Sequence, residues 1–200
     1  MNKANKITMS RIIMSIIIIS MLLIPFDQFG FEFPIFEITG KSQILIVDLK
    51  YIIVGVLFII ASLTDFFDGR VARKYNIVTD FGKMLDAISD KLLTNSVLII
   101  LACLSKIEPT IVVIIVMRDI IVDSIKMVVG NKGQAVAAIG IAKVKTATLM
   151  IGIVLTLFCN LPFQLIGLRV SDFLLALAAI LSIISGVKYY IMAKPYLQER

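Results

Sequence analysis

Five of the chain's ten aspartates lie in one stretch of 26 residues, DFFDGRVARKYNIVTDFGKMLDAISD. Asp65 and Asp68 are three residues apart, and Asp86 and Asp90 are four apart, so each pair shares one face of a helix. If the two faces meet, four carboxylates surround one point and repel one another unless cations lie between them. Carboxylate oxygens suit Mg²⁺ or Mn²⁺. The segment therefore predicts a site for two divalent cations.

Basic residues beside these aspartates favour a phosphate-bearing ligand over a bare cation. Arg70, Arg73 and Lys74 lie between the two pairs and would repel a free metal ion. Two divalent cations about 3.5–4 Å apart can clamp an in-line displacement at phosphorus. The chain has no histidine, so a general base must be a carboxylate, a lysine or a tyrosine. The aspartate cluster is the leading candidate for that base.

The composition indicates a membrane protein. The chain is 59% hydrophobic with a mean hydropathy of +0.99, and 17% of its residues are charged against about 25% in soluble domains. Two hundred residues of this kind predict one polytopic membrane domain, residues 1–200. The net charge of +6 is expected in cytoplasmic loops beside membrane lipids, and no nucleic-acid partner is expected. Cys103 and Cys159 are far apart and predict neither a disulfide nor a metal site.

We expect an all-α fold with six transmembrane helices, separated by turns with glycine or proline. The second helix continues through Thr64 into the aspartate-rich segment. The basic N-terminus followed by an apolar run also resembles a signal peptide, but no small-x-small cleavage site follows, which favours a retained first span. The second span is expected to begin near Leu45, and the other five are about 7–26, 80–105, 109–130, 134–160 and 172–193.

Charged residues must lie within several of these spans. The uncharged runs 51–64, 92–105 and 109–117 are shorter than the roughly 20 residues that cross a bilayer. Charges at such depth face a bundle interior or a wet cavity. The basic residues gather in segments on one side of the predicted spans, which the positive-inside rule assigns to the cytoplasm. We therefore expect a multi-pass protein of the plasma membrane with a polar cavity and an active site facing the cytoplasm.

The aspartate segment resembles the signature of the CDP-alcohol phosphatidyltransferases: DxxDGxxAR from Asp65 to Arg73, eight residues, then GxxxDxxxD from Gly82 to Asp90. The resemblance implies a homodimeric membrane enzyme with Mg²⁺ or Mn²⁺, two per active site. An alcohol attacks the β-phosphorus of a CDP-linked lipid, and CMP leaves. The resemblance further implies metal binding by Asp65, Asp68 and Asp86, a shared metal and base role for Asp90, and CDP-lipid binding by Asp65, Asp68, Gly69, Ala72, Arg73, Gly82 and Thr8.

Three further elements are similar to those of bacterial phosphatidylglycerolphosphate synthases within this family. They are NxxTxxR at residues 5–11, Arg118-Asp119 with Lys126, and Ala142-Lys143-Val144-Lys145-Thr146, where alanine replaces a glycine. This similarity implies CDP-diacylglycerol and glycerol 3-phosphate as substrates. Cations deep in a membrane protein need anionic partners, and the acceptor phosphate would supply one. The candidate acceptor-phosphate ligands are Arg118, Lys126, Lys143 and Lys145.

Several alternatives remain open. Asp119 and Asp123 could instead neutralise these cations, with Asp123 and Lys126 as an i, i+3 pair. Thr8 and Arg11 either touch the nucleotide or anchor the first helix. The acceptor could be serine, inositol phosphate or phosphatidylglycerol. Membrane prenyltransferases also bind Mg²⁺-pyrophosphate, but their aspartate motifs lie farther apart. A divalent-cation transporter would not need the basic cluster. We interpret Tyr189, Tyr190 and Tyr196 as a membrane-interface belt.

Overall fold

Six α-helices account for most of the protein. The computed structural model describes residues 3–39, 44–74, 80–133 and 139–197; side chains 3–7, 44, 65–74, 80–84, 86–87 and 197 lie outside the description. The helices are α1 (Lys3–Leu23), α2 (Leu49–Lys74), α3 (Asp80–Cys103), α4 (Pro109–Asn131), α5 (Gly140–Leu157) and α6 (Val170–Leu197). Two short 3₁₀ segments, Phe26–Phe29 and Phe163–Ile166, follow α1 and α5.

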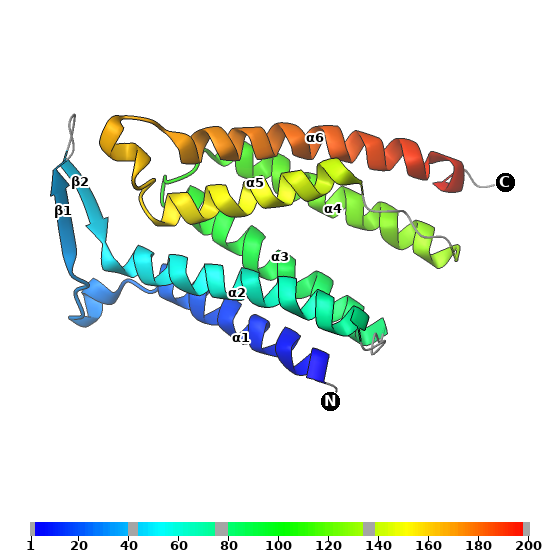
Figure 1. Ribbon diagram of the computed structural model, residues 1–200, viewed down its shortest axis with the longest axis horizontal. Helices are drawn as coiled ribbons and strands as arrows, with labels where there is room; N and C mark the ends of the chain where they lie inside the picture. The colour runs from blue at the N-terminus through cyan, green and yellow to red at the C-terminus, as the bar shows by residue number, and fades with distance from the viewer. Residues whose placement is uncertain (1–2, 40–43, 75–79, 134–138, 198–200) are drawn as a thin grey trace.

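Successive helices run in opposite directions, so the connections alternate between two ends of the molecule (Figure 1). One end holds both termini, the end of α2 and the start of α3. The helices pack mainly as two groups, α1 with α2 and α3, and α6 with α4 and α5. Contacts of α2 with α5 and of α3 with α4 join the groups. The predicted all-α fold with six helices is therefore confirmed.

Each helix buries a stripe of apolar side chains at helical spacing. On α2, the fully buried residues Val54, Phe58 and Ala61 follow the i, i+4, i+7 pattern. The stripe joins one core to which all six helices contribute. Gly152 of α5 lets α6 approach closely, because a Cβ atom there would lie 2.9 Å from Cδ2 of Leu175. The helix pairs are thus fixed by complementary packing.

Local signals in the sequence set the helix ends. Pro109 occupies the first turn of α4, where its missing N–H costs nothing. Before α6, the buried side chain of Asn160 accepts a hydrogen bond from the Ser171 backbone N–H (3.1 Å) and donates one to the Leu168 carbonyl (2.6 Å). Gly167, with φ of 76°, supplies the left-handed turn in between. The loop before α6 is therefore held in one conformation.

The connection between α1 and α2 contains a β-hairpin that the sequence reading missed. Strand β1 (Ile35–Thr39) pairs antiparallel with β2 (Ile44–Asp48), in a register that places Ile35 opposite Asp48. The prediction that the second helix begins near Leu45 was wrong, because α2 begins at Leu49. The run Ile44–Val47 is rich in β-branched residues and follows turn-forming residues, which favours a strand.

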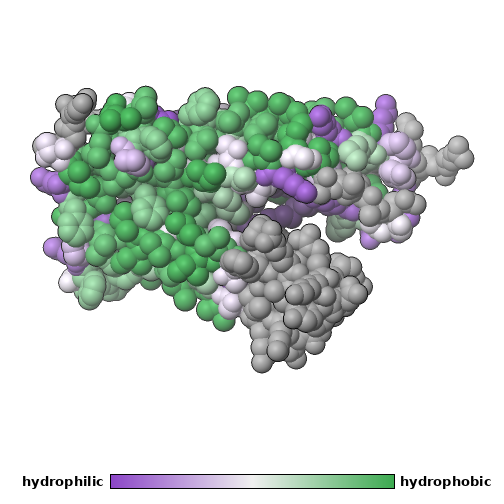
Figure 2. All heavy atoms as spheres, in the orientation of Figure 1, coloured by the Kyte–Doolittle hydropathy of each residue, from purple (hydrophilic) through white to green (hydrophobic). Residues whose placement is uncertain are grey.

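The outer surface is strongly apolar. Figure 2 shows hydrophobic residues over most of the face in view, with hydrophilic ones toward its two ends and in a group near its middle. Within the described residues, α5 over Gly140–Leu157 and α6 over Val170–Tyr196 are long and apolar enough to cross a membrane. Thr8–Leu23 and Leu49–Thr64 are shorter apolar helices. The chain thus has the character of a membrane protein, while α3 and α4 carry charges within their length.

Candidate active site

The aspartate motif lies where α2 ends and α3 begins. The backbone places Asp65 and Asp68 in the last turns of α2 and Asp86 and Asp90 in the first turns of α3. Both helix ends lie at the end of the molecule that holds the termini (Figure 1). The predicted ligands whose side chains lie outside the described set are Asp65, Asp68, Gly69, Ala72, Arg73, Gly82 and Asp86. Their roles as metal and CDP-lipid ligands stay predictions.

Asp90, the fourth motif carboxylate, is held by a buried arginine. Arg11 of α1 is fully buried, and its Nη1 donates to Oδ1 of Asp90 at 3.2 Å and to Oγ of Ser89 at 3.1 Å. The Asp90 side chain remains 45% exposed. The NxxTxxR element therefore ties α1 to α3 through Arg11 and orients the candidate base. Thr8, one turn earlier on α1, is also buried.

A second charged cluster joins α4, α5 and α6. Asp119 of α4 accepts hydrogen bonds from Nη1 of Arg118 at 2.8 Å and from Nζ of Lys145, whose distances to its two oxygens are 2.9 and 3.1 Å. Lys145, on α5, is only 3% exposed. Nη2 of Arg118 donates to Oγ of Ser185 on α6 at 2.8 Å. Asp119 thus neutralises part of this cluster, as one alternative from the sequence proposed.

Tyr189 of α6 completes this cluster. The Arg118 guanidinium carbon lies 5.5 Å from the centroid of its ring, and Nζ of Lys126 lies 4.9 Å from the same centroid. Tyr189 is 2% exposed, so interpreting it as part of an interface belt was wrong; Tyr190 and Tyr196 are exposed. We call Arg118, Asp119, Lys126, Lys145 and Tyr189 the cationic cluster.

Lys143 does not join the cationic cluster. It is exposed on α5, whereas Lys145 is buried, because residues two apart on a helix point to nearly opposite faces. Of the four predicted acceptor-phosphate ligands, the structure therefore brings together Arg118, Lys126 and Lys145. The alternative in which Asp123 pairs with Lys126 at i, i+3 does not hold among the described residues, because Asp123 forms an ion pair with Lys91 of α3 instead.

Lys91 connects the two halves of the candidate site. It follows Asp90 on α3, and its ion pair with Asp123 reaches across to α4. Lys91 also lies within electrostatic reach of Asp119, Lys126 and Asp90. Asp90 of the motif and the cationic cluster of α4–α6 are therefore neighbours through Lys91. Such a pairing of carboxylates with cations suits a reaction between two phosphate-bearing substrates.

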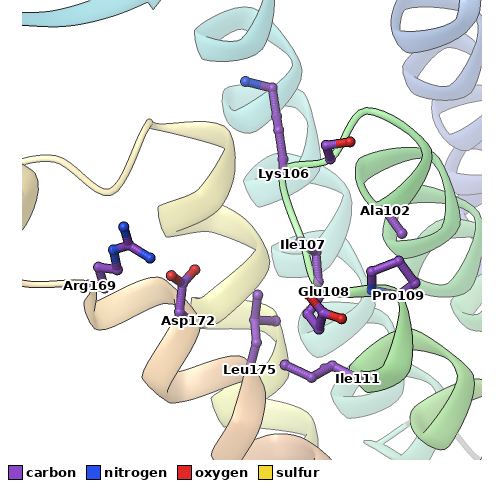
Figure 3. Close-up of a pocket in the computed structure, with 10 residues that line it drawn as sticks. Ala102, Lys106, Ile107, Glu108, Pro109, Ile111, Arg169, Asp172 and Leu175 are labelled. Atoms are coloured by element: carbon purple, nitrogen blue, oxygen red, sulfur yellow. The ribbon is translucent and has the colours of Figure 1, made fainter.

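A cavity of about 420 Å³ lies at the opposite end of the molecule. Figure 3 shows its walls, formed by the connection between α3 and α4 and by the start of α6. Arg169 and Asp172 lie at the start of α6, while Lys106 extends toward α2 and its Nζ lies 4.0 Å from the Tyr51 ring centroid. This cavity contains none of the predicted site residues.

Comparison with known families identifies this arrangement. Residues 1–184 match the family model described as CDP-alcohol phosphatidyltransferase. The chain belongs to the CDP-alcohol phosphatidyltransferase family. The resemblance of the aspartate motif is thereby confirmed, and with it the expectation of a phosphatidyltransferase.

Several curated relatives of this chain share one name. The protein named CDP-diacylglycerol--glycerol-3-phosphate 3-phosphatidyltransferase from Bacillus subtilis is 36% identical over 189 residues, covering 94% of this chain and 93% of the relative. Proteins of the same name are 38% identical over 143 residues in Rickettsia bellii, covering 71% of this chain and 79% of the relative, and 37% identical over 143 residues in Rickettsia felis, with the same coverage.

The sequence reading missed three residues that contact the arginines of the candidate site. Ser89, Ser185 and Tyr189 make polar or ring contacts with Arg11 or Arg118 across helix interfaces. A serine or tyrosine in an apolar run has no distinctive local pattern. For the two residues on α6, the helical periodicity of the sequence could have indicated burial. Ser182, Ser185 and Tyr189 fall on one face of α6, and all three are buried.

Proposed function

We propose that this protein transfers the phosphatidyl group of CDP-diacylglycerol to glycerol 3-phosphate, giving phosphatidylglycerol phosphate and CMP. Family membership and the name shared by the curated relatives support this reaction. The observation that carries the choice of acceptor is the cationic cluster beside the carboxylate motif.

The charge of the cationic cluster matches a phosphate monoester. Arg118, Lys126 and Lys145 carry three positive charges and Asp119 carries one negative charge, which leaves two positive charges. A phosphate monoester carries about −1.5 to −2 at pH 7. Serine brings no net negative charge, and the phosphodiester of phosphatidylglycerol brings one. The cluster therefore favours glycerol 3-phosphate or another phosphorylated alcohol.

An unsatisfied donor supports the same choice. Nε of Arg118 is buried and has no hydrogen-bond partner among the described residues, although both Nη atoms are engaged. Leaving a buried donor unpaired costs about 1–3 kcal/mol. A phosphate oxygen of the bound acceptor would satisfy this Nε. Arg118 can take this position because Gly186 on α6 has no side chain; a Cβ atom there would lie 3.2 Å from Cγ of Arg118.

In the proposed mechanism, the cationic cluster binds the acceptor phosphate and directs the free hydroxyl toward the CDP-lipid. Asp90 accepts the proton from the glycerol 1-hydroxyl as its oxygen attacks the β-phosphorus. The bond between this phosphorus and the bridging oxygen breaks, and the oxygen leaves with CMP. Arg11 holds Oδ1 of Asp90 and so fixes the direction of the carboxylate. Asp90 then releases the proton to solvent through its exposed side.

The donor chemistry fits a divalent cation. The four motif aspartates supply carboxylate oxygens, which are the ligands that Mg²⁺ prefers. Asp90, whose side chain the structure describes, is partly exposed and therefore accessible to an ion. Asp65, Asp68, Asp86 and Asp90 would hold two Mg²⁺ or Mn²⁺ ions. When bound, these ions neutralise the phosphoryl oxygens and stabilise the departing CMP.

The charge distribution supports an orientation in the membrane. Asp27, Glu32, Glu37, Asp48 and Glu108 lie in the connections at the hairpin end, whereas Arg70, Arg73 and Lys74 at the end of α2 and Lys194 near the end of α6 lie at the other end (Figure 1). The positive-inside rule then places the termini and the site toward the cytoplasm. We propose a multi-pass protein of the plasma membrane with six spans, a polar cavity on the cytoplasmic side and a homodimeric state.

The test is CMP release by the purified protein in mixed micelles with CDP-diacylglycerol and Mg²⁺. One acceptor is supplied at a time: glycerol 3-phosphate, serine, inositol phosphate or phosphatidylglycerol. We expect release with glycerol 3-phosphate alone, and a product that contains phosphatidylglycerol phosphate. Release with serine or phosphatidylglycerol but not with glycerol 3-phosphate would refute the proposed acceptor.

A further inference from the structure

Tyr189 contacts three separate parts of the candidate site. Its ring lies against Arg118 and Lys126 of α4, and its hydroxyl oxygen accepts a 3.4 Å hydrogen bond from the backbone N–H of Ile139, which precedes α5. The side chain is 2% exposed and lies on α6. One aromatic residue thus joins the helix that carries two cations to the start of the helix that carries Lys145.

The two cations reach the Tyr189 ring from different turns of α4. Arg118 and Lys126 are eight residues apart, which corresponds to about 12 Å along a helix axis. Their cationic groups nevertheless lie 5.5 and 4.9 Å from one ring centroid. Both side chains therefore contact the same ring, and Arg118 is also joined through Asp119 to Lys145.

A neutral ring holds cations differently from a carboxylate. Asp119 attracts Arg118 and Lys145 but cancels one of their charges. An aromatic face attracts cations through its quadrupole and removes no charge. The guanidinium plane can stack on a ring while its N–H edge donates to an anion. A cluster held partly by Tyr189 therefore keeps the excess positive charge that a phosphate needs.

We propose that Tyr189 is a positioning residue for the acceptor phosphate, acting through Arg118 and Lys126. This inference rests on the proposed function, because it concerns binding of glycerol 3-phosphate. Tyr189 itself does not touch the reacting atoms. Its ring holds the cationic groups of Arg118 and Lys126 in place, and its hydroxyl fixes the ring relative to the start of α5 by the hydrogen bond from Ile139.

The test compares the Michaelis constants of variants at this position. Tyr189→Leu removes the quadrupole and keeps an apolar side chain, whereas Tyr189→Phe keeps the ring and loses only the hydroxyl. We expect the KM for glycerol 3-phosphate to rise roughly 5- to 30-fold in Tyr189→Leu and at most about threefold in Tyr189→Phe. The KM for CDP-diacylglycerol should not change in either. Tyr190→Leu is the matched control, because Tyr190 is the exposed neighbour on the same helix.

A graded series separates the ring's electrostatics from its shape. Phenylalanine analogues with one, two and five fluorines at position 189 keep the ring and progressively weaken its negative face. The KM for glycerol 3-phosphate should rise with each step, while the melting temperature in detergent stays near that of Tyr189→Phe. A KM that does not change across the series would overturn the inference, even if Tyr189→Leu failed to fold.

CMP release by the wild-type protein distinguishes a failure of this inference about Tyr189 from a failure of the proposed function. If wild type releases CMP with glycerol 3-phosphate and the fluorinated series has no effect, only the role of Tyr189 is refuted. If wild type releases no CMP with glycerol 3-phosphate, the proposed acceptor is refuted first.

Discussion

Replacing Lys145 by methionine tests whether the cationic cluster binds the acceptor. Lys145 is buried on α5, and its Nζ contacts both oxygens of Asp119 at 2.9 and 3.1 Å. Methionine has a similar length and no charge, so it fills the same space. Asp119 keeps its 2.8 Å hydrogen bond from Arg118 and is not left without a partner.

The contacts around Lys145 set the expected magnitudes. A hydrogen bond to a charged group contributes about 1.5–3 kcal/mol. At about 1.4 kcal/mol per tenfold change, loss of this bond to the phosphate raises the KM for glycerol 3-phosphate about 10- to 150-fold. Breaking a buried ion pair costs about 3–5 kcal/mol when a charge is stranded. Because Asp119 keeps Arg118, we expect the free energy of unfolding to fall by only about 1–2 kcal/mol.

The assay is CMP release in mixed micelles, with glycerol 3-phosphate titrated at saturating CDP-diacylglycerol and then the reverse. In Lys145→Met, we expect kcat at saturating acceptor and the KM for CDP-diacylglycerol to stay near wild type. Lys145→Arg keeps the charge and should recover part of the affinity. Lys188→Met, which removes an exposed lysine on α6, controls for the general loss of positive charge.

The reasoning would be refuted by a folded Lys145→Met protein whose KM for glycerol 3-phosphate stays within twofold of wild type. Lys145 would then serve only as a counter-ion for Asp119. An equal rise in both Michaelis constants would also contradict it, because that result indicates a general distortion of the site. Lys143→Met gives a further comparison, and its effect should be the smaller one because Lys143 points away from the cluster.

Four further predictions follow from the described residues. Asp90→Asn should abolish CMP release while binding of the CDP-lipid, measured by equilibrium dialysis in micelles, largely persists; normal turnover would exclude Asp90 as the base. Arg11→Met should lower the free energy of unfolding in detergent by about 1–3 kcal/mol, because the buried guanidinium joins α1 to α3, and Arg11→Lys should recover part of it. A membrane-impermeant maleimide should label Cys103 in intact cells, since it lies at the end opposite the termini; labelling only after permeabilisation would reverse the proposed orientation. Burial raises the pKa of the Cys159 thiol, so less thiolate is present near neutral pH and its labelling should be slower and speed up as pH rises.

The sequence was sufficient to predict the helices and to place the aspartate motif along α2 and α3. Long apolar runs between glycine or proline turns gave the six helices, and α4 begins at the predicted Pro109. The helical spacing of the aspartates agrees with their positions in the last turns of α2 and the first turns of α3. Those features are local, so a single sequence contains them. The hairpin was missed because a short run of β-branched residues next to an apolar helix reads as part of that helix.

Ion-pair partners were harder to predict because they depend on packing between helices. The pairs of Arg11 with Asp90 and of Lys145 with Asp119 join residues 79 and 26 positions apart. Sequence spacing suggested that Asp123 would pair with Lys126 on the same helix, but Lys91 of α3 lies close enough to replace it. Which cation pairs with which carboxylate is set by the helix arrangement, and the sequence alone does not contain that arrangement.

Tyr189 shows how periodicity could have corrected an argument from residue type. A tyrosine near the end of a membrane helix is typical of the interface belt, and residue type gave no reason to separate Tyr189 from Tyr190. However, Ala178, Ser182, Ser185, Tyr189 and Ala193 recur every three or four residues, and all five are buried. Small residues along a stripe allow close approach of a neighbouring helix. A tyrosine within such a stripe faces that helix, and here the helix carries Arg118 and Lys126. The same rule separates a tyrosine that positions cations from one that faces lipid.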